Sequence, residues 1–390
     1  MPTTDPLKFA YWVPNVSGGL VTSTIEQRTD WTYDFNVEVA QLAERVGFEY
    51  ALSQVRYTAS YGADQQHEST SFSLGLLAAT ERLKVIAAVH PGLWHPAVLA
   101  KWLITADHIS GGRAAVNVVS GWFKDEFTGL GEPWLEHDER YRRSEEFIRV
   151  LRGLFLSEAA GEGFELRGDF YRIHDFTLKP GPVDVPGRPH PEIFQGGNST
   201  AARRNGGTVA DWYFSNGKDL DGFTEQHDEV TAHAEAAGRA GQVRFGLNAF
   251  VVARDTEAEA QAVVEEIVAK ANPDAVEGFR QAVKQAGAST ADGKGMWSDS
   301  TTRDLVQYND GFRTGLIGTP EQVARRIVAF KERGVDLFLL GFLHYLEDIA
   351  SFGEQVLPIV RELEAEAVES GALPEPGAAP AAASTAYATA

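Results

Sequence analysis

RAAVNVVSGW, residues 113–122, is the stretch that decides the fold. It follows Gly111 and Gly112, a turn signal, and its small and β-branched residues predict a parallel strand that is buried on both faces. Asn117 interrupts this strand, and a buried amide without a hydrogen-bond partner costs roughly 1–3 kcal/mol. In α/β folds, ligands at the carboxyl ends of strands supply such partners. Asn117 is therefore either a core asparagine satisfied by the protein or part of a binding site.

Strands and helices alternate along the chain on both sides of this stretch. Short apolar runs predict strands, and between them apolar residues recur at helical spacing. The strands are expected at 8–14, 50–55, 84–90, 114–120, 192–196, 212–216, 244–253 and 336–342. Eight strands, each followed by a helix, predict a (β/α)₈ TIM barrel. The alternative is a pair of doubly wound domains, for which the segment 156–190 would have to act as the linker.

The expected domain is a single barrel over residues 1–366 with insertions after strands four and seven. The first insertion, 156–190, contains an alternating segment at 163–176 around a Gly-Asp turn, which predicts a surface hairpin. The second, 287–304, is rich in Gly, Ser and charged residues without periodicity, which is typical of a lid. The Ala- and Pro-rich tail, 371–390, is expected to be disordered.

Composition excludes several kinds of chemistry. The chain has no cysteine, so disulfides, thiolate metal sites and cysteine nucleophiles are excluded. A formal net charge of -20 argues against nucleic acid or an anionic membrane as a partner, since binding to phosphates needs clustered Lys and Arg. No window of about 18 apolar residues and no signal-peptide pattern occurs, so we expect a soluble cytoplasmic protein.

The barrel places an active site among the residues at the carboxyl ends of its strands. These residues are Gln54, Arg56, His90, Asn117, Ser120, Gly196, Asn216, Phe250 and His344. The chain contains no G-x-G-x-x-G or P-loop motif, so nicotinamide and nucleoside triphosphate sites lack their signatures. The histidines near these strand ends do not follow the spacing of metal ligands, and no metal is expected.

Two helix starts are candidates for binding a phosphate. In QGGNST, 195–200, two glycines precede a helix that Asn198 is expected to cap and that Ser199 begins, so its backbone N–H groups could hold an anion. Arg140 and Tyr141 are expected to begin another helix and would offer a guanidinium and a phenol. The alternatives are an ordinary capped helix and a surface pair.

Several longer segments resemble the bacterial-luciferase-like flavin monooxygenases, in particular the branch that oxidises sulfones. The resemblance extends from Lys8 to about Glu366. The segments that carry it are FAYWVPNVSGGLV (9–21), IEQRTDW (25–31), FEYALSQ (48–54), VNVVSGWF (116–123), WLEHDERYRRSEEFIR (134–149), EIFQGG (192–197), DLVQYNDGF (304–312) and GVDLFLLGFLH (334–344). The opening segment and the EHDERYRRSEEF run are much narrower signals than the barrel pattern, which the whole superfamily shares.

The resemblance implies a barrel that binds FMN in its reduced form, FMNH2. Flavin contacts are then expected at Val55, Arg56, Asn117, Glu126, Arg140, Tyr141 and Ser199, the last three near the phosphate. Catalytic roles are expected for Asn117 and for Trp122, which would exclude water together with the lid. His67 and His90 are candidate proton donors, with a core position as the alternative for each.

The resemblance also suggests the substrate and the partners. The alkanesulfonate branch has an arginine and a histidine where this chain has Asn248 and Phe250, and it has a cysteine after strand two that is missing here. The loss of these groups favours a neutral substrate, because a buried anion needs cationic partners. The implied reaction uses O2 to convert dimethyl sulfone to methanesulfinate and formaldehyde, with FMNH2 from a separate NAD(P)H:FMN reductase, in a homodimer or homotetramer. The alternatives are an alkanesulfonate monooxygenase, a deazaflavin-dependent reductase and a flavin-storage protein.

Overall fold

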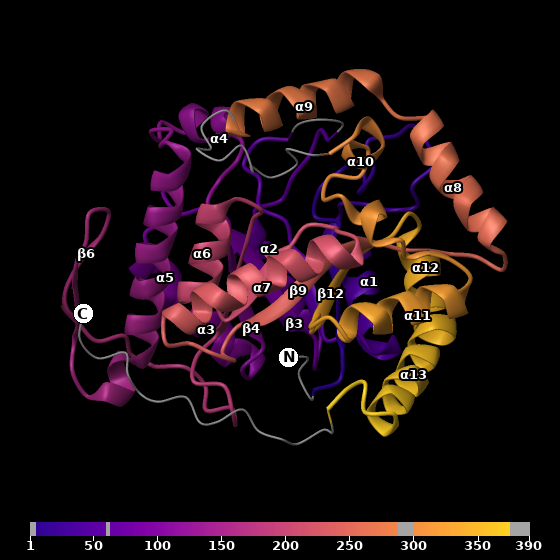
Figure 1. Cartoon of the computed structure of the whole chain (residues 1–390). Helices are drawn as coiled ribbons and strands as arrows, with labels where there is room; N and C mark the ends of the chain where they lie inside the picture. Colours follow the sequence, from indigo (N-terminus) through magenta and orange to yellow (C-terminus); the bar gives the residue numbers. More distant parts are fainter. Residues whose placement is uncertain (1–4, 60–62, 288–299, 375–390) are drawn as a thin grey trace.

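The described part of the computed structural model comprises residues 5–59, 63–287 and 300–374. Within it, eight parallel strands close a barrel in the order β1-β12-β9-β8-β7-β4-β3-β2 (Figure 1). The barrel strands are β1 (Lys8–Val13), β2 (Tyr50–Ser53), β3 (Lys84–Val89), β4 (Ala114–Val118), β7 (Glu192–Gly196), β8 (Trp212–Ser215), β9 (Arg244–Phe250) and β12 (Leu337–Gly341). Each predicted strand is present, and the predicted TIM barrel is confirmed.

Helices surround the barrel and also cover one of its ends. The surrounding helices are α1 (Tyr33–Val46), α2 (Ser69–Ala79), α3 (Pro96–Ser110), α5 (His137–Ala160), α6 (Thr200–Val209), α7 (Leu220–Ala236), α11 (Pro320–Lys331) and α13 (Leu357–Glu369). Shorter or additional helices are α4 (Lys124–Gly129), α8 (Glu257–Ala269), α9 (Pro273–Gly287), α10 (Thr302–Leu305), α12 (Tyr345–Ser351), η1 (Gly311–Thr314) and η2 (Phe352–Val356). Figure 1 shows α4, α9 and α10 together at the top of the molecule. Among the described helices, none has the length and apolarity needed to span a bilayer.

Two small sheets lie outside the barrel. The hairpin expected at 163–176 is present as β5 (Phe164–Arg167) and β6 (Arg172–Phe176), which pair in antiparallel fashion beside α5 (Figure 1). The expected seventh strand, 244–253, is wrong as a single element. The Val251 N–H donates to the Gly341 carbonyl at 3.0 Å, but the Val252 N–H already donates to Leu316. The chain thus leaves the barrel here, and β10 (Val252–Ala253) pairs with β11 (Ile317–Gly318) instead.

Two of the expected segments fall largely outside the described residues. Of the expected lid, 287–304, residues 288–299 lie outside them. The described remainder forms α10, which Thr301 caps by accepting a hydrogen bond from the Asp304 N–H. Of the expected disordered tail, 371–390, residues 375–390 lie outside the described part.

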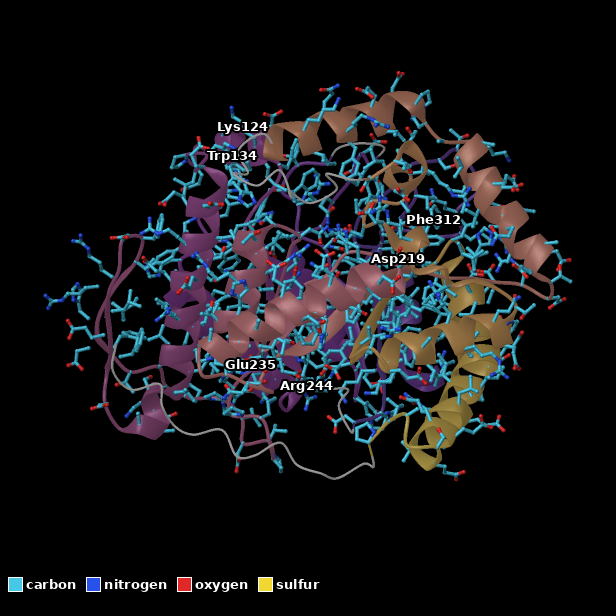
Figure 2. The ribbon with its side chains drawn as sticks, viewed as in Figure 1. Lys124, Trp134, Asp219, Glu235, Arg244 and Phe312 are labelled. Carbon is cyan, nitrogen blue, oxygen red and sulfur yellow. The ribbon has the colours of Figure 1, made fainter. Side chains whose placement is uncertain are left out.

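The amino end of the barrel is closed by side chains. The rings of Phe194 and Trp212 stack inside it with centroids 5.2 Å apart. The Tyr50 hydroxyl and the Trp212 indole N–H both donate to Glu192, whose carboxylate also pairs with Lys84 at 2.7 Å. In Figure 2, Arg244 at the start of β9 lies near the bottom of the molecule, whereas Lys124, which follows β4, lies near the top. A ligand therefore has access from the upper, carboxyl end of the strands.

Candidate active site

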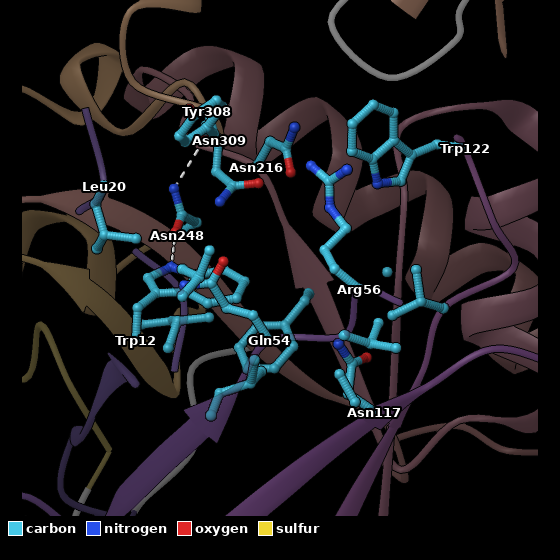
Figure 3. A pocket seen from close by; sticks show the side chains of 18 of the residues that line it. Trp12, Leu20, Gln54, Arg56, Asn117, Trp122, Asn216, Asn248, Tyr308 and Asn309 are labelled. Carbon is cyan, nitrogen blue, oxygen red and sulfur yellow. Dashed lines mark hydrogen bonds between the residues drawn. The ribbon is translucent and has the colours of Figure 1, made fainter. Parts of the chain in front are cut away.

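A cavity opens at the carboxyl ends of the barrel strands (Figure 3). It encloses about 1250 Å³ of free space, including the solvent at its mouth. Its lining comprises Trp12, Val16, Ser17, Gly19, Leu20, Leu52, Gln54, Val55, Arg56, Ala59, Ala63, Gln66, Ala88, Asn117, Val119, Trp122, Gly196, Gly197, Phe214, Ser215, Asn216, Asn248, Phe279, Tyr308, Asn309 and Leu339.

The strand-end residues expected from the sequence divide into two groups. Those that line the cavity are Gln54, Arg56, Asn117, Gly196 and Asn216. His90, Ser120, Phe250 and His344 contact other parts of the protein. The Ser120 and Ser144 hydroxyls are 2.8 Å apart, the Phe250 ring packs edge-on against Phe312, and His344 accepts a hydrogen bond from the Arg28 N–H.

Asn117 has a buried hydrogen-bond acceptor that the described protein leaves unpaired. It lies near the end of β4, where its Cα pairs with Ala88 on one side and Phe194 on the other. Its Oδ1 is buried and has no hydrogen-bond partner in the described protein. Such an acceptor costs roughly 1–3 kcal/mol, which a donor on a ligand would offset. The expectation that Asn117 belongs to a binding site therefore gains support from an unpaired atom.

Aromatic rings form the roof of the cavity. The Arg56 guanidinium lies 4.3 Å from the centroid of the Trp122 ring, within the range of a cation–π contact. Trp122 packs edge-on against Phe279 of α9, and Phe279 packs in the same way against Tyr308. Trp122 was expected to exclude water, and its position in the roof is compatible with that role. Phe279, which covers the cavity from α9, was not singled out by the sequence pattern.

Glu126 and His90 form a buried pair outside the cavity lining. Their side chains are 1% and 2% exposed, and His90 Nε2 lies 3.2 Å from Glu126 Oε2. His90 Nδ1 donates to the Val119 carbonyl at 2.8 Å, and Glu126 accepts from the backbone N–H groups of Tyr57 and Thr58. Burial opposes ionisation, but His90, Tyr57 and the nearby Arg56 hold the pKa of Glu126 below its ordinary value. The pair thus secures the start of the loop that follows β2.

His67, the other candidate proton donor, is also absent from the lining. Its ring lies between those of Trp31 and Phe72, with centroids 5.0 Å from each. The backbone of the neighbouring residues is held by Asn15, whose carbonyl accepts from the His67 N–H at 2.9 Å. The adjacent Gln66 does line the cavity. Within the described ranges, no group of three or more His, Asp or Glu side chains is placed to hold a metal ion.

The expected phosphate ligands lie near one another, although two expected helix starts are wrong. α5 begins at His137, and the Arg140 N–H already donates to the Glu136 carbonyl, so Arg140 and Tyr141 lie inside the helix. Ser199 caps α6 by accepting from the Ala202 N–H at 3.2 Å. Asn198 is not the cap, because its side-chain oxygen accepts from the Gln226 amide.

Tyr141 joins this cluster to the cavity wall. Its hydroxyl bonds to Ser199 and Ser120, and burial raises the pKa of the phenol, so it remains a hydrogen-bond donor. A Cβ on Gly197, which has a φ of 137°, would lie 2.5 Å from this hydroxyl, so only glycine fits between Tyr141 and the cavity. A helix N-terminus, a hydroxyl pair and a phenol at one place favour an anion.

Arg140 adds a positive charge to the cluster. It is 1% exposed, and its guanidinium stacks on Trp134 at 4.0 Å. Burial lowers its pKa to about 10, so it is charged at neutral pH. Nη1 donates to the Leu135 carbonyl, whereas the buried Nε has no partner in the described protein. A buried cation with an unused donor is what a phosphate group requires.

A chain of hydrogen bonds on the opposite side of the cavity was not foreseen. The Trp12 indole N–H donates to Asn248 Oδ1 at 2.5 Å, and Asn248 Nδ2 donates to the Asn309 carbonyl at 2.8 Å (Figure 3). In the sequence, Asn248 was noted only because the alkanesulfonate branch has an arginine at its position. Trp12 and Asn309 lie in segments that resemble the family, but no role was assigned to them. Their shared amide and indole chemistry was visible in the sequence, but their proximity was not.

The chain is similar to known proteins in both sequence and fold. Residues 7–337 match the family described as luciferase-like monooxygenases. The chain is 62% identical over 362 residues to an FMNH2-dependent dimethylsulfone monooxygenase of Pseudomonas putida, covering 93% of this chain and 97% of the relative. It is 59% identical to a protein of the same description from Pseudomonas fluorescens (strain Pf0-1), covering 93% and 96%. A riboflavin lyase solved with modified FMN and riboflavin shares the fold, with a TM-score of 0.78 at 21% identity over 92% of both chains.

Proposed function

We propose, from the premise that this chain belongs to the luciferase-like monooxygenase family, that it is an FMNH2-dependent monooxygenase of dimethyl sulfone. One dimethyl sulfone, one O2 and one FMNH2 would yield methanesulfinate, formaldehyde, water and FMN. The observation that carries the proposal is the 62% identity, over nearly the full length of both chains, to a relative described by that activity. The cavity at the carboxyl end of the barrel supplies a place for the reaction.

The residues around the cavity fit a flavin mononucleotide. Asn117 Oδ1 is an unpaired acceptor that a ring N–H of the flavin would satisfy, and Val55 and Arg56 lie in the same part of the lining. The phosphate would lie near Arg140, Tyr141 and Ser199, where donors and a positive charge gather. Glu126 would act indirectly by holding the loop that carries Arg56. Reduced FMN, when bound, supplies the electrons for the reaction with O2.

The protein's own groups would position the substrate and exclude water. Trp122, Phe279 and Tyr308 cover the cavity with apolar surface, which limits the water that would otherwise divert the reaction to hydrogen peroxide. Asn117 would hold the flavin ring through a hydrogen bond to its Oδ1. His67 and His90 remain proposed proton donors. Neither ring is part of the lining, so each would have to transfer its proton to the cavity through neighbouring residues.

The charge of the lining supports a neutral substrate. Among the lining residues that the structure describes, Arg56 is the one with a charged side chain, and it is stacked on Trp122. Asn248 occupies the place of a cation in the alkanesulfonate branch, and both ends of its amide are engaged by Trp12 and Asn309. A sulfonate anion would lose its hydration in the cavity and find little positive charge there to compensate for it. A sulfone carries no net charge, so its burial costs less.

The proposal includes a second protein and an assembly. Because the sequence has no nicotinamide fingerprint, FMNH2 would come from a separate NAD(P)H:FMN reductase, and we propose that both proteins are cytoplasmic. We also propose a homodimer or homotetramer. Val98 and Ile109 are 58% and 57% exposed on α3, and their spacing of three helical turns puts them on one face. A mass measured by light scattering that corresponds to one chain would contradict this part of the proposal.

The direct test is turnover with an added flavin reductase. We expect consumption of O2 and formation of methanesulfinate and formaldehyde when dimethyl sulfone, NADH and FMN are present. Methanesulfonate and longer alkanesulfonates are assayed as the substrates of the alternative function. Turnover of these compounds without turnover of dimethyl sulfone would contradict the proposal. FMN binding without product would indicate a storage protein, and oxidation of a reduced deazaflavin without O2 uptake would indicate a deazaflavin-dependent reductase.

Replacing Asn117 or Ser199 by alanine is expected to weaken FMN binding by about 1–3 kcal/mol for each residue. The two variants should differ in thermal stability when no FMN is bound. Asn117→Ala removes an unpaired buried acceptor and should leave thermal stability unchanged or higher, whereas Ser199→Ala removes a helix cap and should lower it by about 1 kcal/mol. Calorimetric FMN titration and thermal unfolding measure both effects. Unchanged FMN affinity would remove the residue from the proposed site.

A further inference from the structure

The cavity has two sides that differ in their chemistry. The order of the barrel places β2, β3, β4 and β7 on one arc and β8, β9, β12 and β1 on the other. Val55, Arg56 and Asn117, where the proposed flavin ring would lie, belong to the first arc or directly follow it. The second arc contributes Trp12, Phe214, Asn216 and Asn248 to the lining. If the flavin occupies the first side, the substrate must meet the second.

Asn248 makes hydrogen bonds within the protein through both ends of its amide, and these bonds position Asn309. Its oxygen accepts from Trp12 and its nitrogen donates to the Asn309 carbonyl, which also accepts from the Gly217 N–H at 2.9 Å. These bonds fix the backbone of Asn309 against the ends of β8 and β9. Its side chain then extends into the cavity beside that of Asn216 (Figure 3).

Asn216 has a donor that the protein does not use. It follows β8, and its Nδ2 is buried without a hydrogen-bond partner in the described protein. The neighbouring Ser215 hydroxyl donates to Gln226 Oε1 at 2.8 Å and makes no hydrogen bond with this Nδ2 in the described protein. Figure 3 shows the Asn216 amide between Asn309 and Arg56. In this view the amide oxygen is on the side of Arg56, and the N–H groups remain available to an acceptor on a ligand.

We propose that Asn216 and Asn309 are the residues that determine specificity for the sulfonyl group, an inference that rests on the proposed function. A sulfone has two oxygens that accept hydrogen bonds, no donor and no net charge. Two neutral amides match it, each donating to one sulfonyl oxygen, and the apolar faces of Trp12 and Phe214 receive the methyl groups. A site built to pair with a polar group rejects analogues that lack it, because its own buried groups are then left unpaired.

The test changes the donor while keeping the shape. Asn216→Asp and Asn309→Asp replace the amide nitrogen by an acceptor, and each should raise the KM for dimethyl sulfone about tenfold or more, with a much smaller change in kcat. Asn216→Leu should act like Asn216→Asp, whereas Asn216→Ser keeps a donor and should recover part of the loss. FMN affinity should change little in all four variants, in contrast to Asn117→Ala.

The outcomes separate this inference from the proposed function. Binding of dimethyl sulfone to the FMN-loaded protein, followed by saturation-transfer NMR, gives a readout that does not need turnover. If the unchanged protein neither binds nor oxidises the sulfone, both proposals fail. If it oxidises the sulfone but the Asp variants keep its KM and binding, the inference alone is overturned. An equal loss in Asn216→Leu and Asn216→Ser would assign the effect to side-chain size and would also overturn it.

Discussion

Replacing Glu126 by alanine is expected to lower the free energy of unfolding by about 1–3 kcal/mol, the usual cost of leaving a buried donor without its hydrogen-bond partner. The carboxylate and His90 are almost fully enclosed and lie 3.2 Å apart. Without Glu126, the His90 ring keeps a nitrogen that faces no acceptor, and the N–H groups of Tyr57 and Thr58 lose theirs. We therefore expect the loop after β2 to open locally, and FMN binding to weaken with it.

The pH dependence of this effect has a definite sign. The pKa of Glu126 is held below its ordinary value of 4.5, so its ionised form stabilises the folded protein above that pH, and this contribution is lost as the pH falls through the folded-state pKa. Denaturant unfolding at pH 7 and at about pH 4 should show a larger penalty for Glu126→Ala at pH 7. Glu126→Gln, which keeps the shape and one acceptor, is the matched control and should lose less. Equal stability of Glu126→Ala and the unchanged protein at pH 7 would contradict the argument.

Replacing Asp310 by asparagine is expected to stabilise the protein by up to about 3 kcal/mol at pH 8, since each pKa unit corresponds to about 1.4 kcal/mol. Asp310 is 0% exposed, its Oδ2 has no partner in the described protein, and burial raises its pKa from 3.8 to about 6 despite a hydrogen bond from Ser300. Its φ of 56° lies in the left-handed region, which asparagine adopts more readily than most residues. The substitution thus removes a buried charge without straining the backbone.

The sign again follows from the pKa. The folded state favours protonated Asp310. The contribution of this group to the free energy of unfolding is therefore fully present below pH 3.8 and is lost as the pH rises through 6. The gain from Asp310→Asn should accordingly be present at pH 8 and absent near pH 4 in thermal or denaturant unfolding. Asp304→Asn on the same segment is the opposite control. Burial opposes its ionisation, but Arg313 and Thr301 hold the pKa of Asp304 below 3.8, so this variant should be less stable at pH 8. A destabilised Asp310→Asn at pH 8 would show that its charge is compensated.

This segment matters for function because it carries Tyr308 and Asn309 to the cavity. Gln307 holds it from inside, accepting from the N–H groups of Asn309 and Gly311. A change in the ionisation of Asp310 therefore acts directly beside the proposed sulfonyl site. Comparing the KM for dimethyl sulfone in Asp310→Asn at pH 6 and pH 8 with that of the unchanged protein separates this local effect from global stability.

The barrel itself could be read from the sequence. Short apolar runs and helical periodicity record which residues of each element are buried, and that information is local, so the strand at 114–118 and its neighbours could be placed within a few residues. Asn117 stood out because a polar residue in such a run needs a partner, and the structure leaves that atom unpaired. The boundary of the seventh strand was wrong because Val251 and Val252 continue the apolar run of β9, although Val252 pairs with a different sheet.

The sequence by itself determined the fold, the absence of cysteine chemistry and the strand ends from which the cavity is built. Tertiary structure decided which of those residues meet the cavity. Trp12 and Asn248 are 236 positions apart, and Asn248 and Asn309 are 61 apart, so their contact exists only once β1 and β9 are in the closed barrel. His90 lies beside Glu126 and outside the cavity lining for the same reason. Periodicity specifies the face of an element that is buried, whereas the partner that it meets there depends on the closure of the whole chain.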